Sequence, residues 1–383
     1  MIGPGKNTRL RKSPFGELIT VTPRPQTGWT FPTQIVDTKI YTESINGGTS
    51  TVENGAIVIS TGTDPDGGYI ASTRDFLTYA PGEGAYCYFT NTLDTPEENL
   101  LQMQGPFTKT LEDGWGFGYD GERFGIFKIR GGVQDWIYQD AWNVDTRPNI
   151  NHSFGNVFYI GFQWLGYGMQ YFGIENGETG EVELVHVIKY SNTQPLVSVF
   201  NPSIPITAYI KKNGGSTNNK TMRSPSAVAG LMGEPYPDAF EELVNHDISV
   251  AVGTGLTYLF GIRNPETFLG TENRLYARPV YFMAAVEGNK PASIIVYKNP
   301  NITTPNWTPM DGAVAALEYD EDGTYVPNGE IGVFSVPLGK SDSQNIPVEN
   351  LGTRIPPGAE YGIFVDAEGA TDVRVSITFK VRI

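Results

Sequence analysis

The sequence predicts an all-β protein made of two antiparallel sandwiches. The 383 residues include 45 Gly and 27 Pro, only 18% are charged, and Tyr and Phe number 20 each. Such a composition favours turn-rich sheets over helices. Short alternating segments, with a turn signal about every ten residues, run through most of the chain and are densest from Asp113 to Tyr190. The length exceeds what one hydrophobic core usually serves, which predicts two domains.

Residues 1–34 are expected to form an extended arm with at most one short edge strand. Prolines at positions 4, 14, 23, 25 and 32 break helices and remove donors from a β ladder. Four positive charges precede the first acid, so the arm is predicted to dock on an acidic protein surface. Its predicted partner-binding residues are Lys6, Arg9, Arg11, Lys12, Leu18, Trp29 and Phe31. A solvated, disordered terminus is the alternative.

Residues 35–231 predict a jelly-roll sandwich of about eleven strands. Its turns are marked by pairs of residues that tolerate positive φ, namely Asp120-Gly121, Gly131-Gly132, Asn176-Gly177 and Asn213-Gly214. Phe117, Trp164 and Phe172 belong to a set of aromatic residues that alternate along predicted strands, and they are expected in the core. The single cysteine, Cys87, excludes an intrachain disulfide and is predicted to be a small buried hydrophobe.

A linker over residues 232–246 is expected to contain a short helix. The segment PDAFEELVN places Pro237 in a first helical turn and Asp238 near the positive end of the helix dipole. Residues 247–383 then return to short alternating segments separated by Pro-Asn, Asp-Gly and Pro-Pro-Gly turns. They predict a second, smaller β-sandwich.

Charge and hydropathy exclude several partners. A net charge of −15 and a pI near 4.7 argue against nucleic acid, which is bound through clustered Lys and Arg. No run of about 18 apolar residues is present, so no membrane insertion is expected. The start of the chain lacks the apolar stretch of a secretory signal, which predicts synthesis in a cytoplasm.

No catalytic motif stands out, and the chain is predicted not to be an enzyme. The three histidines are scattered, and no G-x-S-x-G nucleophile elbow occurs. Glu181 and Glu183 lie two residues apart, a spacing that a glycosidase groove uses. A solvated sheet face explains that pair better.

Acidic clusters provide weak calcium candidates. Asp64 with Asp66 and Asp320 with Asp322 form two short clusters, and the best set is Asp140, Asn143 and Asp145. None completes an EF-hand loop, so no cofactor is expected. Trp142 and Tyr167 fall in predicted loops rather than strands, and they are the candidate glycan contacts.

Several segments together resemble a known group of proteins. They are SPFGEL, AIVISTG, STRDFLTYAPGEGAYCYFTNTL, DGWGFGYDGERFGIFKIRGG, NVFYIGFQWLGYGMQYFGIENGETGEVELVHVIKYSNT, NRLYARPVYFMAA and NPNITTPNWTPMDGAVAALEYD. From about Ser13 to the C-terminus the chain is similar to virion structural proteins of tailed bacteriophages and large DNA viruses. The resemblance implies a concanavalin-A-like jelly roll as the first domain, and it brings no catalytic motif.

The resemblance also implies a function and partners. The chain is expected in the virion as a non-enzymatic head decoration, head fibre or tail-associated protein. Its partners are then other virion proteins of the capsid or tail and further copies of itself, with a trimer among the options. A glycan-binding adhesion module of a phage fibre or tail, which binds a host-surface glycan, is the alternative. A polysaccharide hydrolase is less favoured.

Overall fold

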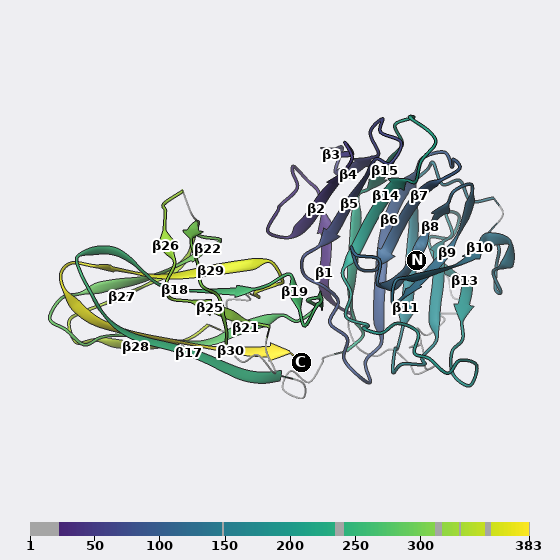
Figure 1. The fold of residues 1–383 in the computed structure, drawn as a ribbon. Helices are drawn as coiled ribbons and strands as arrows, with labels where there is room; N and C mark the ends of the chain where they lie inside the picture. The colour runs from purple at the N-terminus through teal and green to yellow at the C-terminus, as the bar shows by residue number, and fades with distance from the viewer. Residues whose placement is uncertain are drawn as a thin grey trace, which may run out of the picture. The chain divides into compact units, whose positions relative to one another are not determined.

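The computed structural model describes residues 23–147, 149–233, 241–310, 316–328, 331–348 and 354–382. The chain divides into two compact units, Met1–Pro235 and Tyr236–Ile383, each drawn as paired sheets in Figure 1. Within the described residues the regular elements are strands, apart from one 3-10 turn, η1 (Gln139–Ala141). The predicted all-β class is therefore confirmed.

Unit 1 is a sandwich of two antiparallel sheets. The seven-stranded sheet has the order β10-β9-β8-β7-β14-β5-β2. Its strands are β2 (Ile40–Ile45), β5 (Gly68–Thr73), β7 (Leu100–Pro106), β8 (Asp113–Asp120), β9 (Arg123–Arg130), β10 (Val133–Tyr138) and β14 (Ile206–Lys212).

The nine-stranded sheet branches at β6. One path runs β13-β12-β11-β6-β15-β4-β3, while β16 pairs with β6 and carries β1 on its other edge. The strands are β1 (Arg24–Thr30), β3 (Thr49–Glu53), β4 (Ala56–Ser60), β6 (Ala85–Leu93), β11 (Asn156–Phe162), β12 (Gln170–Glu175), β13 (Val182–Ile188), β15 (Thr221–Ser224) and β16 (Ser226–Leu231). Pro225 separates β15 from β16, because proline cannot donate to the ladder.

In β8, aromatic residues and glycines alternate, so the aromatic side chains point to one face of the sheet and the glycines lie on the other. Trp115 and Phe117 are fully buried in the core between the sheets, together with Cys87, whose pKa is raised by burial. The intervening Gly116 lies on the opposite face, where a Cβ would come within 2.2 Å of the Phe127 ring. The predicted core residue Phe172 is also fully buried, and Trp164 packs against this core while partly exposed.

β1 is an edge strand within the predicted arm, and the partner-binding role predicted for two arm residues is wrong. β1 pairs with β16 over Arg24–Thr30, and a register shift after Pro25 absorbs the missing donor. Trp29 and Phe31, which were expected to bind a partner, are buried in the core of unit 1. Trp29 Nε1 donates to Ser224 Oγ at 3.1 Å. Lys6, Arg9, Arg11, Lys12 and Leu18 lie outside the described residues.

Unit 2 is the second sandwich. One sheet has the order β17-β30-β21-β28 and the other β24-β25-β18-β29-β22-β27, with two short two-stranded sheets, β19-β20 and β23-β26, in addition. The strands are β17 (Glu241–Val252), β18 (Gly255–Asn264), β19 (Thr267–Phe268), β20 (Thr271–Glu272), β21 (Ala277–Val286), β22 (Ala292–Lys298), β23 (Ile302–Thr303), β24 (Thr308–Pro309), β25 (Glu318–Asp320), β26 (Thr324–Tyr325), β27 (Ile331–Leu338), β28 (Ser343–Pro347), β29 (Ala359–Ala367) and β30 (Thr371–Arg382). Phe260, Phe282, Val365 and Phe379 lie in its core.

The helix expected at residues 237–245 is wrong where it can be checked. Residues 237–240 lie outside the described part, and Glu241–Asn245 are the start of β17. β17 pairs with β30 along twelve residues, from Glu241↔Arg382 to Val252↔Thr371. This long ladder overrides a local helical preference, which is only a weak prior.

Candidate functional site

The best predicted calcium cluster does not converge on a common point. Asp140 forms an exposed ion pair with Arg123 at 3.2 Å. Asn143 instead holds the edge of β13, because its amide donates to Val187 O at 2.9 Å and its Oδ1 accepts Val187 N–H at 2.9 Å. Asp145 Oδ1 accepts the N–H of Arg147 at 2.9 Å. Each side chain thus has its own structural partner.

The other two acidic clusters shape their own loops. Asp64 Oδ1 accepts the N–H of Asp66 at 2.9 Å, a local turn contact. Asp320 is fully buried and accepts the N–H groups of Asn306 at 2.6 Å and Gly323 at 3.0 Å and the Tyr258 hydroxyl at 2.8 Å. Within the described ranges no group of three or more His, Cys, Asp or Glu side chains is placed to hold a metal ion.

The two acids considered for glycoside hydrolysis lie in different environments. Glu181 is exposed and precedes β13, whereas Glu183 is half-buried and forms an ion pair with Arg147. Glu183 Oε1 also accepts from Asn176 Nδ2 at 3.1 Å. Because Arg147 and Asn176 both hold the Glu183 carboxylate at the sheet edge, we assign it a structural role.

The outward face of the seven-stranded sheet lacks a facing pair of carboxylates at its centre. A second apolar cluster lies there, comprising Ile70, Met103, Phe107, Phe127, Ile129 and Tyr209. Asp120 lies at the end of β8, where its Oδ2 accepts the Tyr138 hydroxyl at 2.8 Å. A glycosidase of this architecture needs two acids across the groove. On the described strands β7, β8 and β9, this face offers Leu, Met, Gly, Phe and Ile in those positions.

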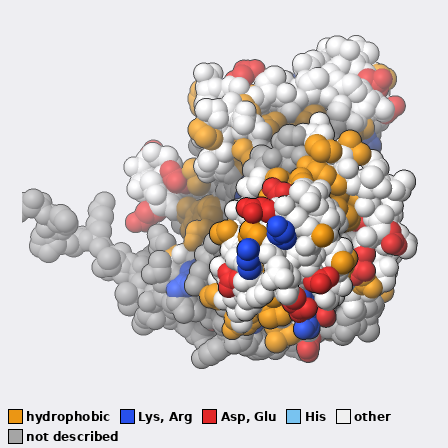
Figure 2. Space-filling model, turned by 90° about the vertical axis from the view of Figure 1, so that its left-hand side faces the viewer, with side chains coloured by type: hydrophobic (Ala, Val, Ile, Leu, Met, Phe, Trp, Pro, Cys, Tyr) orange, Lys and Arg blue, Asp and Glu red, His pale blue; other side chains and the backbone are white. Residues whose placement is uncertain are grey.

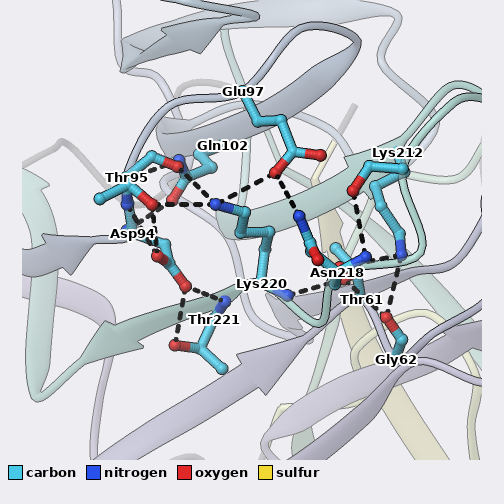
Figure 3. A network of polar contacts seen from close by, with 11 residues as sticks. Thr61, Gly62, Asp94, Thr95, Glu97, Gln102, Lys212, Asn218, Lys220 and Thr221 are labelled. Carbon is cyan, nitrogen blue, oxygen red and sulfur yellow. Dashed lines mark hydrogen bonds and ion pairs between the residues drawn. The ribbon is translucent and has the colours of Figure 1, made fainter.

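A polar network joins three loops at one end of unit 1, as Figure 3 shows. The buried Lys212 donates through Nζ to Gly62 O at 3.0 Å and Asn218 O at 3.1 Å. Lys220 donates through Nζ to Thr95 Oγ1 at 2.9 Å and forms an ion pair with Glu97 at 3.2 Å. Two ammonium groups thus cross-link loops that are far apart in sequence.

Asp94 and Gln102 extend this network beneath the loops. Gln102 Oε1 accepts Asp94 N–H at 2.8 Å, and Asp94 Oδ2 accepts Thr221 N–H at 2.8 Å (Figure 3). Hydrogen bonds to Ser216, Asn218 and Lys220 lower the pKa of Glu97, with Ser216 the largest cause. The acids and lysines satisfy one another, so the network stabilises the loops.

Trp142 is a core residue, which corrects its assignment as a glycan contact. Its side chain is buried against Phe117 and Phe124, with ring centroids 5.9 and 6.0 Å away. Its Nε1 donates to Ile137 O at 3.1 Å. The loop that holds Trp142 folds back over the sandwich, so a loop position in the sequence did not mean exposure.

Tyr167 lies in an exposed apolar patch at the other end of unit 1. Two hydrogen-bonded loops there expose Leu165, Tyr167, Leu196 and Phe200, with exposed fractions of 52%, 41%, 53% and 60%, and we call these four residues the patch. Leu165 and Tyr167 come from the loop between β11 and β12, and the other two from the segment before β14. The sequence pointed to Tyr167 but not to the other three, although SNTQPLVSVFNPS sets the apolar run LVSVF between turn formers.

Hydrogen bonds fix the two loops of the patch. Tyr167 Oη donates to Pro195 O at 3.0 Å, and Ser198 N donates to Gly166 O at 2.9 Å. From beneath, Trp164 Nε1 donates to Val199 O at 3.2 Å. The buried Asp113 accepts the N–H of Phe200 at 2.9 Å. The two loop backbones and the Tyr167 ring are therefore held in place, so this ring needs little ordering when a ligand binds.

The charged side chains do not form a single basic surface on the face drawn in Figure 2. Acidic and basic groups are interspersed there, and hydrophobic side chains reach the surface between them. Among the described residues no helix is long and apolar enough to cross a membrane.

No protein-family model and no curated protein matches the chain. Among solved structures it is similar to the carbohydrate recognition domain of Emp47p, with 9% identity, a TM-score of 0.35 and coverage of 59% of this chain and 99% of that one. The lectin UEA-II complexed with galactose has 8% identity, a TM-score of 0.32 and coverage of 54% and 99%. A putative beta-glucanase from Mycobacterium abscessus has 12% identity, a TM-score of 0.34 and coverage of 51% and 94%.

These neighbours have concanavalin-A-like β-sandwich folds of the lectin and glycosyl hydrolase type. Their low identity and TM-scores limit the likeness to the general fold. No site residue or activity carries over from them to this chain.

Proposed function

We propose that unit 1 is a non-catalytic glycan-binding module that holds sugar through the patch of Leu165, Tyr167, Leu196 and Phe200. The observation that carries this proposal is the Tyr167 ring, which is exposed yet fixed by its hydroxyl bond to Pro195 O. A fixed aromatic ring offers a flat apolar face to the C–H groups of a sugar ring at low entropic cost.

The surroundings of the patch support a sugar over a purely apolar ligand. The exposed polar residues 191–194 are separated from the patch residue Leu196 only by Pro195, and their hydroxyl and amide groups match sugar hydroxyls. The patch itself contains no carboxylate, which favours binding over hydrolysis. Display on a virus particle, with capsid or tail proteins as partners, stays a prediction that rests on the resemblance of the sequence.

A glycan array with the purified full chain tests this proposal. Wild-type protein is expected to bind a subset of glycans. Tyr167→Ala is expected to weaken that binding by about tenfold or more, the usual loss for an aromatic anchor. Tyr281→Ala, which removes an exposed tyrosine of unit 2, is the matched control and is expected to bind as wild type. The absence of any glycan binding by wild type, or equal losses in both variants, would refute the proposal.

A further inference from the structure

Strand β17 is the longest edge strand in the described part of the chain, and it lacks the usual protection against pairing. It lies at the end of its sheet beside β30 (Figure 1), in continuous register over twelve residues and without proline, lysine or a bulge. Natural edge strands are usually short or carry proline, lysine or a bulge, because their free N–H and C=O groups would otherwise bind another strand.

Other edge strands show such protection. In β1 a register shift follows Pro25, and β27 contains Pro337. The edge of β13 is covered by its own chain, because Asn143 bonds both main-chain groups of Val187. Within the described residues, the main chain of residues 242–252 has no hydrogen bonds beyond the ladder with β30. The outer edge of β17 is therefore free to pair.

The side chain of Asn245 directs its donors toward this free edge. Its Oδ1 accepts the hydroxyls of Ser376 and Thr378 on β30, both at 3.0 Å. Its Nδ2 therefore faces away from β30, and it has no acceptor among the described residues. Asp247, the next residue on the same exposed face, has only a long ion pair with Arg374 at 3.8 Å. β17 thus carries an amide donor and a carboxylate acceptor two residues apart.

We propose that β17 pairs antiparallel with β17 of a second copy of the chain, about a two-fold axis at His246. Residues that face each other in an antiparallel pair lie on the same side of the sheet. This axis therefore sets Asn245 of each copy opposite Asp247 of the other, which gives two symmetric hydrogen bonds from amide to carboxylate. The two four-stranded sheets become one sheet of eight strands across the dimer.

The remainder of β17 also matches its own reverse. On the core side, Val244 faces Ile248 of the other copy, so apolar side chains continue both cores. The acidic residues 241–242 face the uncharged residues 250–251, which keeps the acidic ends of the two strands apart. His246, on the axis, is buried against Phe260 of its own copy. No pair of like charges is placed directly opposite in this register.

The sheet favours a two-fold dimer over a ring of copies. A ring needs β17 to pair with a different edge of its neighbour. The other edge of the same sheet is β28, which has five residues and ends at Pro347. It would cover less than half of the twelve-residue edge of β17, whereas a second β17 covers residues 241–251.

Sedimentation equilibrium of the full chain tests this pairing. Wild type is expected to have twice the monomer mass of 42.0 kDa. Asn245→Asp keeps an oxygen for Ser376 and Thr378 but places a carboxylate opposite each Asp247. It is expected to raise the dissociation constant of the dimer by about tenfold or more. The double variant Asn245→Asp/Asp247→Asn restores one amide and one carboxylate at each contact, so it is expected to dimerise like wild type.

Asn345→Asp is the matched control, because it adds the same charge at an exposed position of β28 on the same face of the sheet. It is expected to dimerise like wild type. The proposal is overturned by a monomeric wild type, by a dimer that Asn245→Asp leaves intact, or by equal losses in Asn245→Asp and Asn345→Asp. Failure of the double variant to recover the dimer would equally contradict the proposed register.

Cysteine cross-linking checks the register without a change of charge. The single native cysteine, Cys87, is buried, so an introduced thiol reports on its own position. A mixture of Asn245→Cys and Asp247→Cys proteins is expected to form more disulfide-linked dimer on oxidation than either protein alone, because the two positions face each other across the axis. Equal yields in the mixture and in the separate proteins would refute this alignment.

Discussion

Replacement of Lys212 by Met is expected to destabilise unit 1 by about 2–3 kcal/mol. Lys212 is 2% exposed, and its ammonium donates to two loop carbonyls, those of Gly62 and Asn218. Hydrogen bonds from a charged donor contribute about 1.5–3 kcal/mol each, but removal of the buried charge also removes its desolvation cost. Gly62 O keeps the Thr61 hydroxyl as a donor at 3.0 Å, so the main loss is at Asn218 O.

Scanning calorimetry measures this effect as a change in the melting temperature of unit 1. At about 2–4 °C per kcal/mol for a domain of this size, the expected decrease is about 4–12 °C. Lys211→Met is the matched control, because Lys211 is adjacent on β14 and points to the opposite face. It is expected to change stability by less than about 0.5 kcal/mol. A Lys212→Met protein as stable as Lys211→Met would refute the view that the ammonium holds these loops.

Three further changes test the packing of unit 1 and its pH dependence. Gly116→Ala, whose Cβ would lie 2.2 Å from Phe127 Cζ, is expected to cost about 1–3 kcal/mol in urea unfolding, whereas Gly155→Ala, with no atom within 4 Å of its Cβ, is expected to be neutral. Trp142→Ala is expected to cost about 3–5 kcal/mol in the same assay, against little for Tyr167→Ala; equal values would contradict the core position of Trp142. Burial lowers the pKa of His152 to about 4. The neutral His152 side chain therefore leaves the free energy of unfolding at its full value above pH 6.5, the approximate pKa of histidine in the unfolded chain. As the pH drops from 6.5 to 4, the free energy of unfolding falls by up to about 3 kcal/mol. His152→Phe should flatten that part of the pH profile.

Local patterns predicted the strands and much of the core, because alternation reports directly which side chains face inward. Phe117 and Phe172 are examples. The predictions were wrong where contacts with residues distant in sequence determine the local structure. The prolines around β1 indicated an arm that binds a partner, yet β1 pairs with β16 and Trp29 is buried in the core. The sequence of residues 237–245 favoured a helix, but the described part, from Glu241, forms the start of β17 and pairs with β30. Trp142 lies in a loop that folds onto Phe124, a contact that only the three-dimensional structure shows.

The arrangement of unit 1 separates loop stabilisation from the proposed recognition. The network of Lys212 and Lys220 is linked to one end of β6, where Asp94 follows Leu93. The Tyr167 loop leaves the opposite end, because it begins after Phe162, which pairs with Ala85. Nine residues of β6 place these ends about 25–30 Å apart. Substitutions that far apart, with no shared partner, are expected to act additively. Hence Lys212→Met should lower stability without changing glycan affinity, and Tyr167→Ala should do the reverse. A loss of glycan binding in the folded Lys212→Met protein would show that the two ends are coupled through the sandwich.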